Sequence, residues 1–226
     1  MENIDKMVQF VLGFRQKDIE QKYRDYLGKV KKMSGPGVIQ ILNKLSSFIS
    51  ENGCYLEIGT HRGCTLIGAS LDNDNIPFYG VDNFAGHNSP SECAPFSTIQ
   101  EGLDHAIKEN CKGNVSYYTL GYQEFFENRE DINGKKVEVY LYDGDHGFEQ
   151  TYDGLKRSIP CLADRAIVVL DDSANNDRGA VWGAINKLLG EDKRFKVVRE
   201  FVPKPGEMHG DYWCGLTILL FERNLS

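Results

Sequence analysis

The segment CYLEIGTHRG, residues 54–63, joins a short apolar run to a turn that contains two glycines. An apolar run ended by glycine predicts a buried β-strand over 54–58, and the apolar residues of 65–71 predict a short helix behind the turn. Gly59 and Gly63 permit a sharp turn and a close approach of the backbone to a ligand, because glycine has no Cβ. The free N–H groups at the start of the helix suit a carboxylate. The segment therefore predicts a strand–turn–helix unit with a ligand site at the end of the strand.

The alternation of strand and helix continues to the end of the chain. Apolar spacing predicts helices between the strands, except between the last two, which follow each other directly. Repeated strand–helix units imply a parallel sheet with helices on both faces, and the missing last helix implies that one strand runs antiparallel. We therefore predict an α/β fold with a seven-stranded, mostly parallel sheet. The six further strands are predicted at 78–82, 115–120, 137–143, 166–172, 195–202 and 215–223.

Helical spacing of apolar residues also marks the part of the chain that precedes the first strand. Two amphipathic stretches, 4–11 and 38–48, are separated by the break SGPG at 34–37. No low-complexity linker or internal repeat interrupts the sequence. We expect one compact domain, with a helical extension or lid over 1–50 and the main α/β unit over 51–226.

The composition is that of a folded protein without a polyanionic partner. The 226 residues carry a formal net charge of -7, whereas phosphate binding needs a concentrated basic surface. The first residues lack the apolar core of a signal peptide, and no apolar run reaches the roughly 20 residues of a membrane helix. The 6 cysteines form no CxxC pair. We therefore expect a cytoplasmic protein that binds neither nucleic acid nor membranes and holds no zinc.

An acidic residue, Asp82, ends the second predicted strand. A carboxylate at this place accepts hydrogen bonds from the ribose hydroxyls of nucleotide-type cofactors. Each feature has a structural alternative, because a glycine turn after a strand and an aspartate at a strand end are common turn formers. Their placement on consecutive strands is more specific, and the glycine spacing differs from the GxGxxG of dinucleotide sites. The two strand ends together predict a site for a ribose-containing cofactor.

Three aspartates end the fourth and fifth predicted strands: Asp143, Asp171 and Asp172. The carboxyl ends of neighbouring parallel strands meet at one edge of a sheet, so we expect the three carboxylates to converge. Like charges at close range raise each other's pKa, and a divalent cation such as Mg²⁺, which prefers hard oxygen ligands, removes the conflict. A cation held there activates a substrate oxygen. A turn role for Asp171 and an N-cap role for Asp172 stay open.

The pattern E-x-G-x-x-x-G at 57–63, followed by Asp82, resembles class I S-adenosylmethionine-dependent methyltransferases. The spacing is similar to that of the catechol and caffeoyl-CoA O-methyltransferases, and the resemblance extends over residues 54–223. It implies a Rossmann-like fold and S-adenosylmethionine as the cofactor. The residues that the resemblance places around the cofactor are Glu57, Gly59, Thr60 and Gly63 at the methionine part, Asp82 and Asn83 at the ribose, Gly121, Tyr122 and Gln123 at the adenine, and Asp143.

The acidic strand ends carry a second resemblance. DGDH at 143–146 and DD at 171–172 are similar to the metal-dependent small-molecule O-methyltransferases. They look closer still to a bacterial branch that includes methyltransferases acting on macrolide sugars. This resemblance implies that Asp143, Asp171 and Asp172 bind Mg²⁺ or another divalent cation.

The same resemblance implies that Asp143 and His146 are catalytic residues. His146 stands three positions after Asp143, where the catechol-type enzymes have a lysine instead. An imidazole suits a general base near neutral pH, so by position His146 would accept the proton of the substrate hydroxyl. The structural alternative, in which Asp145 and His146 cap the helix that begins near Phe148, stays open.

From these resemblances we expect an enzyme that methylates a hydroxyl group of a small acceptor, such as a sugar, polyol or phenol. The alternatives are a metal-independent small-molecule methyltransferase, a non-catalytic subunit that binds S-adenosylmethionine, and a nicotinamide dehydrogenase. The N-terminal helices and the loops 84–95 and 202–214 are expected to shape the acceptor pocket. The last loop is rich in aromatic residues, which suits stacking on a ring and equally a homodimer contact. The sequence does not identify the acceptor.

Overall fold

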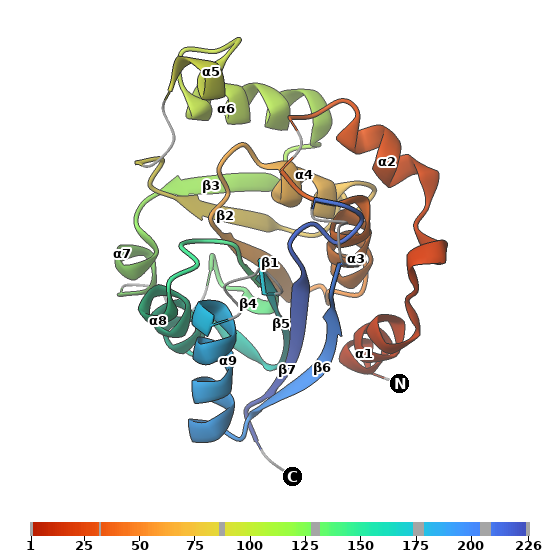
Figure 1. Ribbon diagram of the computed structural model, residues 1–226, viewed down its shortest axis with the longest axis vertical. Helices are drawn as coiled ribbons and strands as arrows, with labels where there is room; N and C mark the ends of the chain where they lie inside the picture. Colours follow the sequence, from red (N-terminus) through yellow and green to blue (C-terminus); the bar gives the residue numbers. More distant parts are fainter. Residues whose placement is uncertain are drawn as a thin grey trace.

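A seven-stranded β-sheet forms the centre of the protein (Figure 1). The computed structural model describes residues 2–31, 33–85, 89–127, 132–173, 179–203 and 209–224. The strands are β1 (Gly53–Ile58), β2 (Phe78–Asp82), β3 (Val115–Thr119), β4 (Lys136–Tyr142), β5 (Leu162–Asp171), β6 (Phe195–Phe201) and β7 (Leu216–Glu222). Their order in the sheet is β3-β2-β1-β4-β5-β7-β6.

The strand directions agree with the sequence-based prediction. The strands β1 to β5 pair in parallel, and β7 runs antiparallel to both β5 and β6. A direct connection without a crossover helix joins neighbouring strands in opposite directions, which is why β6 and β7 pair as they do. The central strand β1 is buried along its whole length, as expected for a parallel strand with helices on both faces. The seven-stranded, Rossmann-like sheet with one antiparallel strand is confirmed.

Helices cover both faces of this sheet (Figure 1). They are α1 (Asn3–Gly13), η1 (Gln16–Asp18), α2 (Gln21–Leu27), α3 (Pro36–Ser46), α4 (Cys64–Ser70), α5 (Pro90–Cys93), α6 (Ile99–Asn110), α7 (Tyr122–Glu127), α8 (Phe148–Ser158) and α9 (Gly179–Glu191). Apolar side chains of α7, α8 and α9 form one core cluster with the sheet, and those of α1, α3 and α4 form the cluster on the other face. A third cluster joins α2 and α6 to α4. Within the described residues, no helix combines the length and apolar character needed to cross a membrane.

A short helix, α5, interrupts the region 85–95 that the sequence predicts to be a loop, so that prediction is wrong there. Ser89 is the N-cap of α5, and its hydroxyl accepts a hydrogen bond from the N–H of Glu92 at 3.4 Å. The carboxylate of Glu92 accepts the N–H of Ser89 in return, at 3.2 Å. Pro90 occupies the first helical position, where a missing N–H leaves no bond unmade. This reciprocal capping stabilises a turn of helix without any apolar periodicity.

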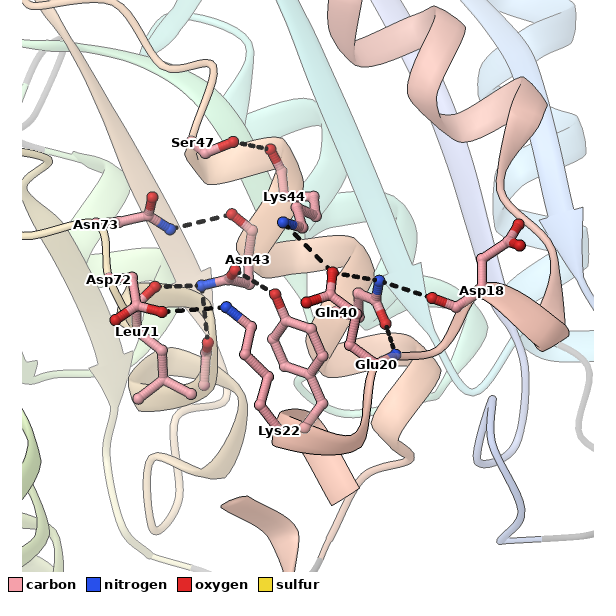
Figure 2. Close-up of polar contacts among 12 residues, drawn as sticks. Asp18, Glu20, Lys22, Gln40, Asn43, Lys44, Ser47, Leu71, Asp72 and Asn73 are labelled. Atoms are coloured by element: carbon pink, nitrogen blue, oxygen red, sulfur yellow. Dashed lines mark hydrogen bonds and ion pairs between the residues drawn. The ribbon is translucent and has the colours of Figure 1, made fainter. Parts of the chain in front are cut away.

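A buried asparagine ties the N-terminal helices to the rest of the fold (Figure 2). Asn43 lies on α3, and its side-chain oxygen accepts a hydrogen bond from the hydroxyl of Tyr23 on α2 at 2.6 Å. Its side-chain nitrogen donates to the carbonyl of Leu71 after α4 at 2.6 Å. The side chain of Asn73 donates to the carbonyl of Asn43 at 3.0 Å. These hydrogen bonds satisfy buried polar groups and join α2 and the segment after α4 to α3.

A second amide, Gln40 on the same helix, holds the segment before α2 (Figure 2). Its oxygen accepts the N–H of Glu20 at 2.8 Å, and its nitrogen donates to the carbonyl of Asp18 at 3.1 Å. Through Gln40 and Asn43, α3 holds both the end of η1 and α2. The division of the chain at residue 50 stays a prediction, although α3 packs within the core of the main unit.

The N-terminal segment also contacts the segment between β6 and β7. The carboxylate of Asp211 accepts hydrogen bonds from Arg24 at 2.7 Å and from Gln16 at 2.8 Å. The backbone carbonyl of Asp211 accepts the N–H of Gly37 at 2.8 Å. Three N-terminal elements thus fix the turn that leads to Trp213.

Candidate active site

A cavity of about 920 Å³ opens at the carboxyl ends of the parallel strands. Its wall is formed by the segments that follow β1, β2, β3, β4 and β5. This is the edge of an open parallel sheet at which ligands bind, and the volume suits a small molecule together with a cofactor. The cavity collects eleven of the residues that the sequence predicts for the site: Gly59, Thr60, Asp82, Asn83, Gly121, Tyr122, Gln123, Asp143, His146, Asp171 and Asp172.

The turn after β1 is shaped by its contact with the loop after β4. Gly59 has a φ of +90°, and a Cβ placed on it would lie 1.9 Å from the carbonyl oxygen of Asp143. Any side chain here would push the two loops apart. The neighbouring strand, and not only a ligand, therefore requires glycine at this position. Gly63, the second glycine of the motif, has a φ of +75° and faces Leu103, and it does not line the cavity.

Glu57 is fully buried behind the cavity wall and does not line it. Its carboxyl group accepts hydrogen bonds from the hydroxyl of Tyr55 at 2.8 Å and from that of Thr65 at 3.0 Å. Burial raises the pKa of Glu57 to about 8. Since Thr65 lines the cavity, Glu57 acts on the site by holding that threonine. The predicted place of Glu57 beside the methionine part of a cofactor stays a prediction, and its side chain lies behind the wall and not on the cavity surface.

Asp82 joins the loops that leave β1 and β2. One carboxylate oxygen accepts the N–H of His61 at 2.7 Å, and the other accepts the N–H of Phe84 at 2.7 Å. Both of these residues have a positive φ, 45° and 53°, so the carboxylate stabilises two strained turns. A carboxylate oxygen has a second lone pair, which leaves each one able to accept a hydrogen bond from a ligand. The two strand ends meet, as the sequence predicts.

The segment after β3 forms the third side of the cavity. Gly121, Tyr122 and Gln123 line it, and α7 begins at Tyr122. The ring of Tyr122 packs edge-on against Tyr142 of β4, with the ring centroids 6.2 Å apart. An aromatic wall of this kind suits the planar face of a base.

The three strand-end aspartates come together at the opposite side of the cavity. Removal from water and the charge of its neighbour raise the pKa of Asp143 well above its ordinary value. The same causes raise the pKa of Asp171 to about 8. One oxygen of Asp171 and one of Asp172 are buried without a hydrogen-bond partner in the described part of the chain. Among the described residues, however, no three His, Cys, Asp or Glu side chains form a group arranged to hold a metal ion.

His146 faces this acidic cluster from the loop after β4. Its Nε2 atom lies 3.2 Å from a carboxylate oxygen of Asp172, and 45% of its side chain is exposed. The N-cap of α8 is Gly147, which leaves His146 without the capping role that the sequence left open. The carboxylate of Asp145 accepts the N–H of Gly147 at 2.7 Å and so shapes the turn before the helix.

Trp213 brings the segment between β6 and β7 to the cavity. Its ring stacks on that of His209, with the centroids 4.3 Å apart, and both residues have a positive φ. Residues 86–88 and 204–208 of the two predicted pocket loops lie outside the described residues. The sequence analysis anticipated this aromatic segment and the loop that begins at Phe84. It did not single out Met33, Arg62, Thr65 or Gln150, which also line the cavity.

Comparison with known proteins relates this architecture to one enzyme class. A family model described as "Methyltransferase domain" matches residues 56–173, more than half of the chain. No curated protein matches the sequence.

Solved structures of other proteins share the fold. A putative caffeoyl-CoA O-methyltransferase from Staphylococcus aureus aligns over 95% of this chain and 98% of its own, with a TM-score of 0.60 and 15% identity. An O-methyltransferase from Bacillus cereus in complex with SAH aligns over 98% of both chains, with a TM-score of 0.58 and 13% identity. TomG from Streptomyces achromogenes, an O-methyltransferase of tomaymycin synthesis in complex with SAM, aligns over 94% of this chain and 93% of its own, with a TM-score of 0.60 and 13% identity.

The buried carboxyl group of Glu57 predicts a pH-dependent stability. Its pKa rises from 4.5 to about 8 on folding, so the stability present below pH 4.5 is lost as the pH rises towards 8. The side chain of Glu57→Gln stays neutral at every pH. We expect the free energy of unfolding of Glu57→Gln minus that of wild type to be at least about 1 kcal/mol higher at pH 9 than at pH 5. Urea unfolding at both pH values measures the difference. The exposed Glu149→Gln serves as the control. If the difference between Glu57→Gln and wild type is the same at both pH values, the conclusion that Glu57 is protonated in the folded protein is wrong.

Proposed function

The chain belongs to the methyltransferase domain family, and on this premise we propose that it methylates a hydroxyl oxygen of a small acceptor such as a sugar, polyol or phenol. As a member of that family it is an S-adenosylmethionine-dependent enzyme. One observation supports the proposal above the others: a single cavity holds the joined loops of β1 and β2 and the acidic ends of β4 and β5. The loops of β1 and β2, which we call the cofactor half, thereby face the ends of β4 and β5, which we call the acidic half and which would remove the acceptor proton.

The cofactor half would hold S-adenosylmethionine through three loops. Asp82 is placed to accept hydrogen bonds from the ribose hydroxyls, since each of its oxygens keeps a free lone pair. The segment Gly121–Gln123 is placed to contact the adenine ring. Gly59 and Thr60 line the cavity, and Gly59 lies against the β4 loop, so a methionine part held at this turn would be close to Asp143.

For the reaction, the protein must align the acceptor with the methyl group and remove the proton of the acceptor hydroxyl. In methyl transfer the hydroxyl oxygen attacks the methyl carbon, the carbon–sulfur bond breaks, and the sulfur leaves as a neutral thioether. Holding the oxygen about 3 Å from the carbon accounts for much of the rate. His146 would take the hydroxyl proton, and Asp172 at 3.2 Å would orient the imidazole and stabilise its charged form.

A divalent cation such as Mg²⁺ fits the chemistry of the acidic half. Burial and neighbouring negative charge raise the pKa of Asp143 and of Asp171 there, and one oxygen of Asp171 and one of Asp172 are buried without a partner in the described part of the chain. Asp143, Asp171 and Asp172 would hold the ion through hard oxygen ligands. When bound, it would lower the pKa of an acceptor hydroxyl and neutralise the repulsion. The support comes from charge and donor type, because these side chains do not lie in a ready-made ligand arrangement.

The metal-independent alternative has an observation of its own. Asp143 and Asp171 share a side-chain hydrogen bond, and the raised pKa of both allows one to remain protonated. A carboxyl pair that shares one proton carries one negative charge instead of two, so it can persist without a cation. In that case the aspartates would bind the acceptor hydroxyl directly, and His146 would keep its role.

Cofactor binding tests the assignment of Asp82. We expect wild type to bind S-adenosylhomocysteine in isothermal titration calorimetry, and Asp82→Asn to bind it at least about 10-fold more weakly, because the amide loses an acceptor for the ribose diol. Asp104→Asn, an exposed change outside the cavity, should leave the affinity unaltered. If Asp82→Asn and wild type bind S-adenosylhomocysteine with equal affinity, Asp82 does not bind the ribose. If wild type does not bind it, the proposed function is wrong.

An acceptor screen with S-adenosylmethionine labelled on the methyl group tests the reaction and its metal dependence. We expect transfer to a hydroxylated small molecule, loss of transfer after treatment with a chelator, and recovery on adding Mg²⁺. The same preparation without the chelator is the control. Full activity after chelation would decide for the metal-independent alternative.

Replacement of the proposed base separates chemistry from binding. We expect His146→Gln to lower kcat by at least about 100-fold, because proton removal in the transition state is lost, while the affinity for S-adenosylhomocysteine stays the same. His105→Gln, an exposed histidine outside the cavity, is the matched control. Wild-type turnover in His146→Gln would exclude His146 as the base.

A further inference from the structure

One cation on the cavity wall has no role in the reaction described above. Arg62 lies in the turn after β1 and lines the cavity. Its Nε and Nη2 atoms are buried and have no hydrogen-bond partner in the described part of the chain. A guanidinium group carries five N–H donors and cannot give up its charge, so donors left unpaired away from water cost free energy. These donors are therefore suited to bind a ligand that supplies hydrogen-bond acceptors.

The charge of the cavity limits what that ligand can be. Five carboxyl groups line the wall, and Arg62 is the only lysine or arginine among the lining residues that the structure describes. The acidic residues are Asp82, Asp143, Asp145, Asp171 and Asp172. A ligand that suits this wall carries more positive than negative charge and has one anionic group. S-adenosylmethionine has this distribution, with a sulfonium, an ammonium and a single carboxylate.

We propose that Arg62 binds the α-carboxylate of the methionine part of S-adenosylmethionine. The inference rests on the proposed function and adds the residue that balances the one negative charge of the cofactor tail. Arg62 stands in the turn between Gly59 and Thr65, both of which line the cavity. A guanidinium pairs with a carboxylate through two parallel hydrogen bonds, which fixes the direction of the amino-acid tail as well as its charge.

The location favours the cofactor over an anionic acceptor. The acceptor hydroxyl must approach the ends of β4 and β5, where Asp171 and Asp172 would repel a carboxylate or phosphate. Arg62 belongs to the β1 turn, which Asp82 holds to the loop after β2 through the N–H of His61. It therefore stands on the cofactor side of the cavity.

Two ligands that differ in the amino-acid tail test the proposal. S-adenosylhomocysteine carries the carboxylate, and 5′-methylthioadenosine has the same nucleoside and sulfur without the amino-acid group. We expect Arg62→Gln to bind S-adenosylhomocysteine about 10- to 100-fold more weakly than wild type in calorimetric titration, and 5′-methylthioadenosine within about 2-fold of wild type. Arg62→Lys should recover part of the loss. Arg157→Gln, which removes an arginine of α8 that pairs with Asp153 outside the cavity, is the matched control.

Each other outcome overturns the assignment. An equal loss for both ligands would mean that Arg62 only shapes the turn. Unchanged affinity for both ligands would exclude the carboxylate contact, and a raised KM for the acceptor in that variant would assign Arg62 to the acceptor instead. If wild type does not bind S-adenosylhomocysteine, both the proposed function and the Arg62 assignment are wrong. If wild type binds it and Arg62→Gln binds it equally well, only the Arg62 assignment is wrong.

Discussion

The site depends on one contact in which there is no room for a side chain. Gly59 ends β1 against the carbonyl group of Asp143, and a Cβ there would overlap that oxygen. Because the two backbones meet, the loop of β1 and the loop of β4 become walls of one cavity. The β1 loop carries the groups suited to a cofactor, and the β4 loop carries the acidic groups. A glycine that sequence motifs associate with the ligand is thus required first by the packing of two strands.

Buried charge gives the cavity its second constraint. Burial and the charge of neighbouring carboxylates raise the pKa of Asp143 and of Asp171, and burial raises the pKa of Glu57 behind the wall. Such a wall attracts cations, whether a metal ion or a sulfonium group. Arg62 is the arginine among the described lining residues, and it suits a negative group of the ligand. The distribution of charge along the wall therefore orients an elongated ligand before any shape complementarity acts.

The N-terminal helices belong to this site through long-range hydrogen bonds. The amides of Asn43 and Gln40 hold α2 and the segment before it on α3, and Asp211 fastens them to the turn that carries Trp213. Met33 enters the cavity wall from the N-terminal side, and Trp213 from the C-terminal side. Met33 and Trp213, which are far apart in the sequence, therefore form one part of the cavity wall, which we call the rim. Any change that loosens the Asp211 contacts acts on the rim without touching the cofactor loops.

Local chemistry along the chain was enough to predict the sheet, its strand directions and most of the loops that line the cavity. Apolar runs, glycine turns and acidic strand ends act over a few residues, and parallel pairing places all the strand ends at one edge. The alternation of side chains along β1 also carried an unused signal: Glu57 shares a face with Tyr55, to which it is hydrogen-bonded, and so points into the core and not over the strand end. What the chain alone could not specify is which distant groups meet. The burial of the Arg62 guanidinium in the cavity wall and the arrival of Trp213 at the cavity follow from how all the elements pack, because burial is a property of the assembled fold and not of any one segment.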